Sequence, residues 1–199
     1  MTKIFAFLFL MLSAFPVRAE KTDDGFYTRF DAGGVYSTQT SLKKGISVRA
    51  GVGQKWADML RTELTVEYTR TVMRGRGSYD GRAVNVRTRL PSLAAMASAY
   101  VDLFEFKNVT PYIGAGAGVS RNALPDAVVD GRQVFGLTRF RTAWQVSGGI
   151  GIGLPENLVL DIGYAYTDLG KFSTKTSLPP VLTQDVKVRK INIGLRYNF

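Results

Sequence analysis

The stretch RKINIGLRYNF, residues 189–199, decides the fold, because its residues alternate with the two-residue period of a β-strand. One side is apolar after its first position and ends in two aromatic residues: Arg189, Ile191, Ile193, Leu195, Tyr197 and Phe199. The other side is polar or small: Lys190, Asn192, Gly194, Arg196 and Asn198. A half-buried strand of a soluble protein has the same pattern, so the rest of the chain decides which side faces inward.

The same alternation recurs in seven earlier stretches: residues 25–35, 45–53, 60–69, 92–102, 111–121, 138–154 and 158–169. The alanines of the fourth stretch also suit a helix, but its period favours a strand. Long polar segments follow the first, third, fifth and seventh strands: residues 36–44, 71–89, 122–137 and 170–185. Pro91 is expected at a strand start, because proline cannot donate to a sheet.

Long and short connections that alternate are typical of barrels that cross a membrane, with long loops outside the cell and short turns in the periplasm. The strands have about the length needed to cross a bilayer at a tilt, roughly 9–11 residues. The sequence therefore predicts an eight-stranded antiparallel up-and-down transmembrane β-barrel.

The first residues are typical of a secretory signal peptide. Lys3 gives the positive start, residues 4–15 are almost entirely apolar, and Ala19 precedes the expected cleavage point. The apolar run is too short for a spanning helix, which needs about 20 residues. We therefore expect residues 1–19 to be a cleaved signal peptide and residues 20–199 to form the barrel.

The formal net charge is +10. An exported chain rarely meets nucleic acid, so we expect no nucleic-acid partner. Outer-membrane lipid and lipopolysaccharide are anionic partners that suit a basic surface, and charges that point inward and pair explain the rest. The chain has no Cys, so it forms no disulfide.

A soluble barrel with an apolar interior and a hydrophobic ligand is the main alternative fold. The long loops at one end only argue against it, as do aromatic residues near the strand ends. These aromatic residues suit girdles at the two membrane interfaces: Tyr27, Tyr36, Trp56, Tyr68, Phe104, Phe106, Tyr112, Phe140, Tyr164, Tyr166, Tyr197 and Phe199.

If the apolar sides face lipid, the polar sides fill the barrel, and buried opposite charges must pair. We expect a lumen charge network of Arg29, Arg49, Arg61, Glu63, Glu67, Asp102, Asp161 and Arg196. Inward glycines should leave room for these long side chains: Gly114, Gly116, Gly118, Gly149, Gly151 and Gly153. Such a network would plug the lumen; the alternative is that water threads it and a few ions leak.

Residues 71–89 are expected to be a loop or a hairpin that extends beyond the membrane. They carry five arginines that suit contact with phosphate or sulfate groups: Arg74, Arg76, Arg82, Arg87 and Arg89. A solvated polar loop without a ligand explains the same residues.

Three motifs, with the terminal strand, resemble small outer-membrane β-barrels of the OmpA/OmpX type and the opacity-type surface antigens of Gram-negative bacteria. They are MASAYVD at residues 96–102, TPYIGAGAG at 110–118 and LDIGYAYTDLG at 160–170. The chain departs from that family at Ser98, where Asn is common, and at Ala165, where Arg is common. The resemblance implies location in the outer membrane and insertion by the barrel-assembly machinery, with Tyr197 and Phe199 as the assembly signal.

Some small outer-membrane barrels are enzymes, and their chemistry typically uses His. This chain has no His and no Cys, which excludes Ser–His and Cys–His catalysis. We expect no enzymatic activity, no cofactor and no metal. Glu63 and Glu67 are more simply partners of arginines than a catalytic pair. The expected function is a structural and surface-interaction barrel that contacts lipopolysaccharide, glycans or host surface molecules; the alternative is a narrow porin-like channel.

Overall fold

The computed structural model describes residues 25–37, 42–56, 59–79, 82–123, 127–129, 132–134, 138–173 and 183–199. The expected signal peptide lies outside these residues. The described part contains no helix long and apolar enough to span a membrane.

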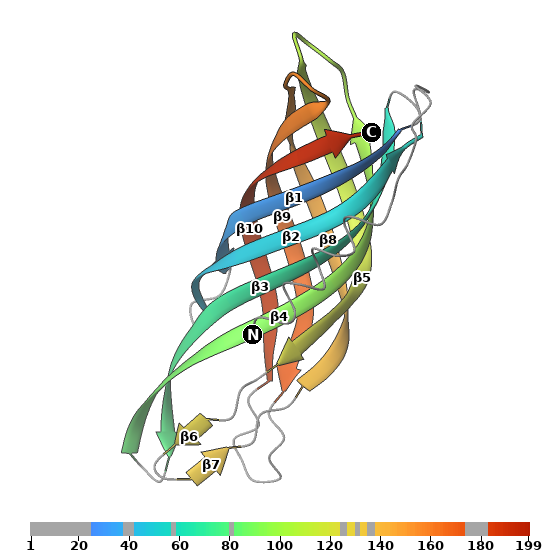
Figure 1. The fold of residues 1–199 in the computed structure, drawn as a ribbon. Helices are drawn as coiled ribbons and strands as arrows, with labels where there is room; N and C mark the ends of the chain where they lie inside the picture. The colour runs from blue at the N-terminus through green and yellow to red at the C-terminus, as the bar shows by residue number, and fades with distance from the viewer. Residues whose placement is uncertain are drawn as a thin grey trace.

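Eight antiparallel strands close into one barrel, in the order β1-β10-β9-β8-β5-β4-β3-β2 (Figure 1). Their bounds are β1 Phe26–Ser37, β2 Leu42–Lys55, β3 Leu60–Tyr79, β4 Arg82–Asp102, β5 Val109–Ala123, β8 Thr138–Gly153, β9 Leu158–Ser173 and β10 Thr183–Asn198. Two short strands, β6 Ala127–Val129 and β7 Arg132–Val134, form a separate hairpin between β5 and β8. Each long strand pairs with its neighbour in sequence, and β1 pairs with β10, which confirms the predicted up-and-down barrel.

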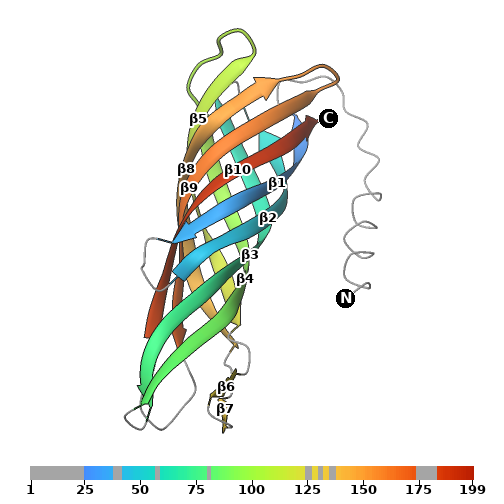
Figure 2. The same cartoon turned by 90° about the vertical axis from the view of Figure 1, so that its left-hand side faces the viewer.

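The connections sort to the two ends of the cylinder. The turns β4–β5 and β8–β9 lie at the same end as the C-terminus, and the β3–β4 hairpin extends from the other end (Figures 1 and 2). The β4–β5 and β8–β9 turns each place two consecutive residues in the left-handed region. Lys107 and Asn108 have φ of 46° and 65°, and Glu156 and Asn157 have φ of 62° and 60°. Two positive φ values in a row suit a tight hairpin, because they match the twist of the flanking strands.

The strands are longer than the sequence predicts. For residues 71–89 the sequence left a loop and an extending hairpin open, and the structure has the hairpin, because β3 and β4 stay paired as far as Tyr79 and Arg82. Pro91 therefore lies inside β4, opposite Arg70, rather than at its start. Pairing of β4 with β5 begins only at Ser92 among the described residues, so Pro91 lies where β4 has one paired neighbour and a missing donor is tolerated.

The apolar side faces outward. Ile46 is 62% exposed and Ile193 is 57% exposed, whereas Glu63 is 2% exposed and Arg61 is 1% exposed. Polar side chains thus fill much of the inside of the cylinder, and apolar side chains cover its outside. One buried apolar cluster shares the interior: Val35, Leu90, Ala94, Met96, Ala143, Leu169, Val186 and Val188. This inversion suits a lipid environment, and the closed sheet leaves no edge with unpaired backbone groups.

Two predicted girdle residues prove to be interior. Tyr27 and Tyr112 are only 1% and 5% exposed, since each lies on the inward side of its strand. Proximity to a strand end indicated a membrane interface, but the period-two position decides the direction of a side chain. Trp56, Phe104, Phe106 and Phe140 are exposed, as a girdle requires.

Candidate functional site

The barrel interior holds ten buried charged side chains among the described residues, which we call the interior network. Five are basic and five are acidic, so their formal charges cancel: Arg29, Arg49, Arg61, Lys190, Arg196, Asp31, Glu63, Glu67, Asp102 and Asp161. They come from six strands, β1, β2, β3, β4, β9 and β10. Strand register brings several of them side by side: Asp31 lies opposite Arg49, and Arg49 lies opposite Glu67.

Arg29 lies at the centre of the network. Its Nε and Nη2 donate to Asp31 at 2.9 and 2.6 Å, and its Nη1 donates to the two carboxylate oxygens of Glu63 at 2.8 and 3.1 Å. Arg49 Nε donates to the same Asp31 at 2.9 Å. Two guanidinium groups thus share one carboxylate, and these charge-assisted bonds link β1, β2 and β3.

Arg61 closes the network toward the short turns. Its Nε and Nη2 bind the Asp102 carboxylate at 2.8–3.0 Å, and its Nη1 lies 3.6 Å from Glu63 Oε1. The guanidinium carbon lies 5.9, 5.3 and 5.1 Å from the ring centres of Tyr27, Tyr100 and Tyr112. Three aromatic rings and two carboxylates therefore surround one cation, which is a favourable environment for a buried guanidinium.

Two further ion pairs complete the set. Lys190 Nζ donates to Glu67 at 2.6 and 2.8 Å, and Thr69 Oγ1 donates to the same carboxylate at 2.8 Å. Arg196 Nε lies 3.4 Å from Asp161, and its guanidinium lies 5.3 Å from the Tyr27 ring. The Asp161 carboxylate has no hydrogen-bond donor among the described residues, so this pair is the loosest of the network.

All eight residues named from the sequence lie inside the barrel, but two members of the network were missed. The two missed residues are Asp31, which forms ion pairs with Arg29 and Arg49, and Lys190, which forms an ion pair with Glu67. The signal was present in both cases, because each residue occupies an inward position of a strand with clean alternation. Which opposite charges meet depends on the register between distant strands, and one strand's pattern does not contain that information.

The inward glycines serve the tyrosines more than the arginines. A Cβ at Gly114 would overlap the Tyr100 ring, and a Cβ at Gly149 would lie 2.7 Å from the Tyr112 hydroxyl. Of the six glycines expected to make room for long charged chains, Gly151 alone faces one: its Cβ would lie 3.1 Å from Arg196 Nη2. Ser98, one of the two departures from the family pattern, accepts a hydrogen bond from Gln145 at 3.0 Å.

The remaining predicted site residues lie elsewhere. The five arginines of residues 71–89 fall on the β3–β4 hairpin, with Arg74 opposite Arg87; their side chains lie outside the described part of the structure. Tyr197 and Phe199 face outward on and just after β10, with their rings 5.2 Å apart at 87°. The Phe199 N–H donates to the Phe26 carbonyl at 2.9 Å, at the seam where β1 meets β10.

A polar vestibule of about 950 Å³ opens at the short-turn end. Arg61, Arg196 and Tyr27 line it, together with Asp102 and residues of the turns. Arg61 Nη1 and Arg196 Nε have no hydrogen-bond acceptor in the described structure. No group of three or more His, Cys, Asp or Glu residues suited to a metal ion occurs within the described ranges.

A family model described as "Outer membrane protein beta-barrel domain" matches residues 5–199. An uncharacterized protein of Brucella abortus (strain 2308) is 33% identical over 149 residues, which cover 63% of this chain and 52% of that protein. An uncharacterized protein of Brucella suis biovar 1 matches equally well. The chain thus spans about half the length of the curated relatives it matches.

Two solved barrels have the same fold. Neisserial surface protein A superposes with a TM-score of 0.60 at 23% identity, covering 87% of this chain and 97% of the other. The outer membrane protein OprG from Pseudomonas aeruginosa gives 0.66 at 14% identity, covering 88% and 96%. At these identities the likeness concerns the fold alone.

Proposed function

The chain belongs to the outer-membrane β-barrel family and lies in the outer membrane, and from that premise we propose that it is a closed barrel that anchors a surface-contact hairpin. Its interior network supports a structural role, because the ion pairs join strands that are distant in sequence. Its β3–β4 hairpin supports the contact role, because it carries Arg74, Arg76, Arg82 and Arg87 beyond the described pairing with β2 and β5.

The balance of buried charge is the observation that best supports a closed lumen. Five cations and five anions face one another inside an eight-stranded cylinder, whose interior is just wide enough for side chains to fill. An ion that entered would have to break charge-assisted hydrogen bonds. The network therefore acts as a plug in this proposal, which requires no catalysis, metal or cofactor.

The hairpin arginines are proposed to bind phosphate or sulfate groups of lipopolysaccharide, glycans or host surface molecules. Bidentate contacts with such groups favour arginine over lysine. Residues 1–19 act as a cleaved signal, and Tyr197 with Phe199 directs insertion by the barrel-assembly machinery.

The contact role is tested by replacing Arg74, Arg76 and Arg87 with glutamine. Surface plasmon resonance should show weaker binding to immobilised lipopolysaccharide, with the loss largest at low salt, because exposed charges act through screened electrostatics. The matched control replaces Arg121, Arg189 and Lys107, which lie off the β3–β4 hairpin, and should bind as the parent does. Equal binding by all three proteins would overturn the role of the hairpin.

A narrow channel is the second candidate function. The vestibule at the short-turn end supports it, because it reaches Arg61 and Arg196, whose unpartnered N–H groups suit bound water. Liposomes that hold a potassium gradient discriminate the two candidates: a closed barrel keeps the gradient, and a channel for ions dissipates it.

A further inference from the structure

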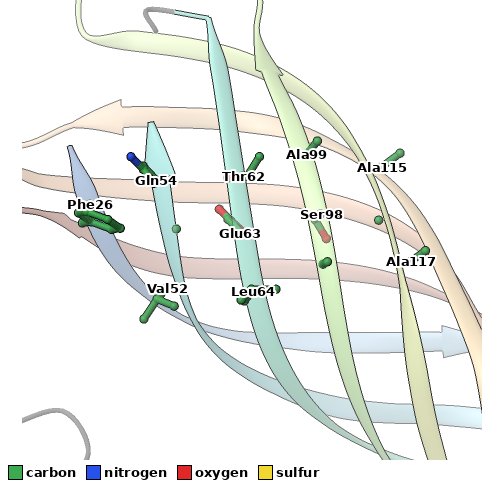
Figure 3. Close-up of a pocket in the computed structure, with 13 residues that line it drawn as sticks. Phe26, Val52, Gln54, Thr62, Glu63, Leu64, Ser98, Ala99, Ala115 and Ala117 are labelled. Atoms are coloured by element: carbon green, nitrogen blue, oxygen red, sulfur yellow. The ribbon is translucent and has the colours of Figure 1, made fainter. Parts of the chain in front are cut away.

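A groove of about 730 Å³ lies across β1 to β5 of the barrel. Its outward side chains form two adjacent rows of the strand register. The row nearer the short turns contains Phe26, Gln54, Thr62, Ala99 and Ala115, and the next row contains Val52, Leu64, Ala97 and Ala117. Figure 3 shows these side chains on neighbouring strands.

The groove exists because its floor is built from alanines. Ala97, Ala99, Ala115 and Ala117 are exposed, and they pair with one another across β4 and β5. Larger exposed side chains border this block: Leu64 on β3 pairs with Ala97, and Trp144 on β8 pairs with Ala117. Elsewhere the outward surface carries large side chains such as Phe30, Ile193 and Leu195. The depression is therefore continuous with the lipid-facing surface of an outer-membrane barrel.

The row nearer the short turns contains two polar side chains. Gln54 and Thr62 are register partners at the short-turn end of β2 and β3, and both line the groove. Trp56 Nε1 donates to Thr62 Oγ1 at 2.7 Å, and the Trp56 side chain is 51% exposed. Exposed tryptophans with a bonded N–H are typical of the membrane interface. The side-chain amide of Gln54 lies in the same register row as Thr62 and has no hydrogen-bond partner among the described residues.

We propose that the groove binds one phospholipid of the leaflet on the short-turn side. One acyl chain lies over the four alanines, and the Gln54 amide donates to the glycerol-ester oxygens. Strands are about 4.8 Å apart, so a floor two strands wide admits one acyl chain. A second barrel is convex and much broader, and it would meet Leu64 and Trp144 before it reached the floor. This lipid site rests on the outer-membrane location of the chain. It does not depend on a closed lumen or on ligand binding by the hairpin arginines.

The test uses the folded barrel in vesicles of phosphatidylethanolamine and phosphatidylglycerol with a trace of phospholipid that carries a diazirine on its acyl chain. After irradiation, the cross-linked peptides are mapped by mass spectrometry. The variant Ala97→Leu/Ala117→Leu fills the groove, and Gln54→Leu removes the polar contact. Ala32→Leu is the control, because Ala32 is exposed on β1 between Val48 and Ile193, away from the groove. Heat-modifiable gel mobility confirms that each variant folds.

The parent should cross-link preferentially at residues 92–121. Filling the groove should lower that yield about tenfold. This is the loss of affinity expected when about two methylene groups of the acyl chain lose their contacts with the barrel. Gln54→Leu should lower it about fivefold, the value of about one hydrogen bond, and Ala32→Leu should not change it. Cross-links spread evenly around the parent barrel would overturn the proposal. So would barrel-to-barrel cross-links that disappear when the groove is filled, because the occupant would then be a second copy.

Discussion

At the scale of single residues, Glu63 connects the two halves of the interior network. It accepts hydrogen bonds from Tyr27 at 2.9 Å and from Arg29 at 2.8 and 3.1 Å, and it lies 3.6 Å from Arg61. Both arginines are almost fully buried. The neutralisation of Glu63 would leave two guanidinium groups short of charge, which costs far more than the loss of an exposed pair.

We therefore predict that Glu63→Gln lowers the free energy of unfolding by about 3–5 kcal/mol, the cost of breaking a buried ion pair. Urea titration of the barrel in lipid vesicles measures this change. Glu105→Gln is the control, because Glu105 is exposed in the β4–β5 turn and its replacement should cost within about 0.5 kcal/mol. A value for Glu63→Gln as small as the control would contradict a network held by charge.

Lys190 and Glu67 form the pair best suited to a double-mutant cycle. Lys190→Met and Glu67→Gln should each destabilise the barrel by about 3–5 kcal/mol, because each leaves one buried charge without its partner. The double variant should lose less than the sum of the two, with a coupling energy of about 0.5–3 kcal/mol. Additive losses, measured by the same urea titration, would mean that the 2.6 Å contact contributes no net stability.

The direction of a side chain was the most predictable feature at this scale. Alternation placed Arg49, Glu63 and Arg196 inside and Ile46 and Ile193 outside, and the structure has them so. The choice of partner was less predictable. Lys190 lies 123 residues from Glu67, and only the closure of the barrel brings the two together.

At the scale of strands, glycines leave room for aromatic rings against the inner wall. Tyr27 on β1 lies against Gly53 on β2, its register partner, and this position lets its hydroxyl reach Glu63. The composition of the strands predicted that the glycines make space. It did not predict that tyrosines occupy the space at Gly53, Gly114 and Gly149, because residue counts do not show which neighbour fills a gap.

We predict that Gly53→Ala destabilises the barrel by about 1–3 kcal/mol, because the new methyl group would overlap the Tyr27 ring in a packed interior. Tyr27→Ala in the same chain should remove the overlap, so the double variant should be no less stable than Tyr27→Ala alone. Thermal unfolding followed by gel mobility measures both effects. If Gly53→Ala matched the parent, the close packing of ring and strand would be wrong.

The final strand carries a separate prediction about assembly. Phe199→Ala should reduce the amount of folded barrel in the outer-membrane fraction, since the terminal aromatic residue is the proposed insertion signal. Refolding of the purified variant in detergent should match the parent, because Phe199 is 44% exposed and its ring contacts that of Tyr197 at the barrel surface. A similar loss in both measurements would assign Phe199 to stability and not to assembly.

At the scale of the whole molecule, the fold was predictable because one rule governs the entire chain. Eight alternating strands leave one polar and one apolar surface, and only a closed cylinder in lipid satisfies both. The extent of the β3–β4 hairpin was only partly predictable. Val84, Val86 and Leu90 alternate with polar residues on the β4 side, but the residues that follow Val72 on β3 have no such alternation. Main-chain pairing extends it nonetheless as far as Tyr79 and Arg82.

We propose that balanced ion pairs close this cylinder. The most direct test is the current across a planar lipid bilayer that contains the purified barrel. With salt on both sides and a steady voltage, the parent should give no lasting current above that of the bare bilayer, because each interior cation has a carboxylate partner. A large and stable conductance from the correctly folded barrel would contradict the claim, since ions would then pass where the structure places the network.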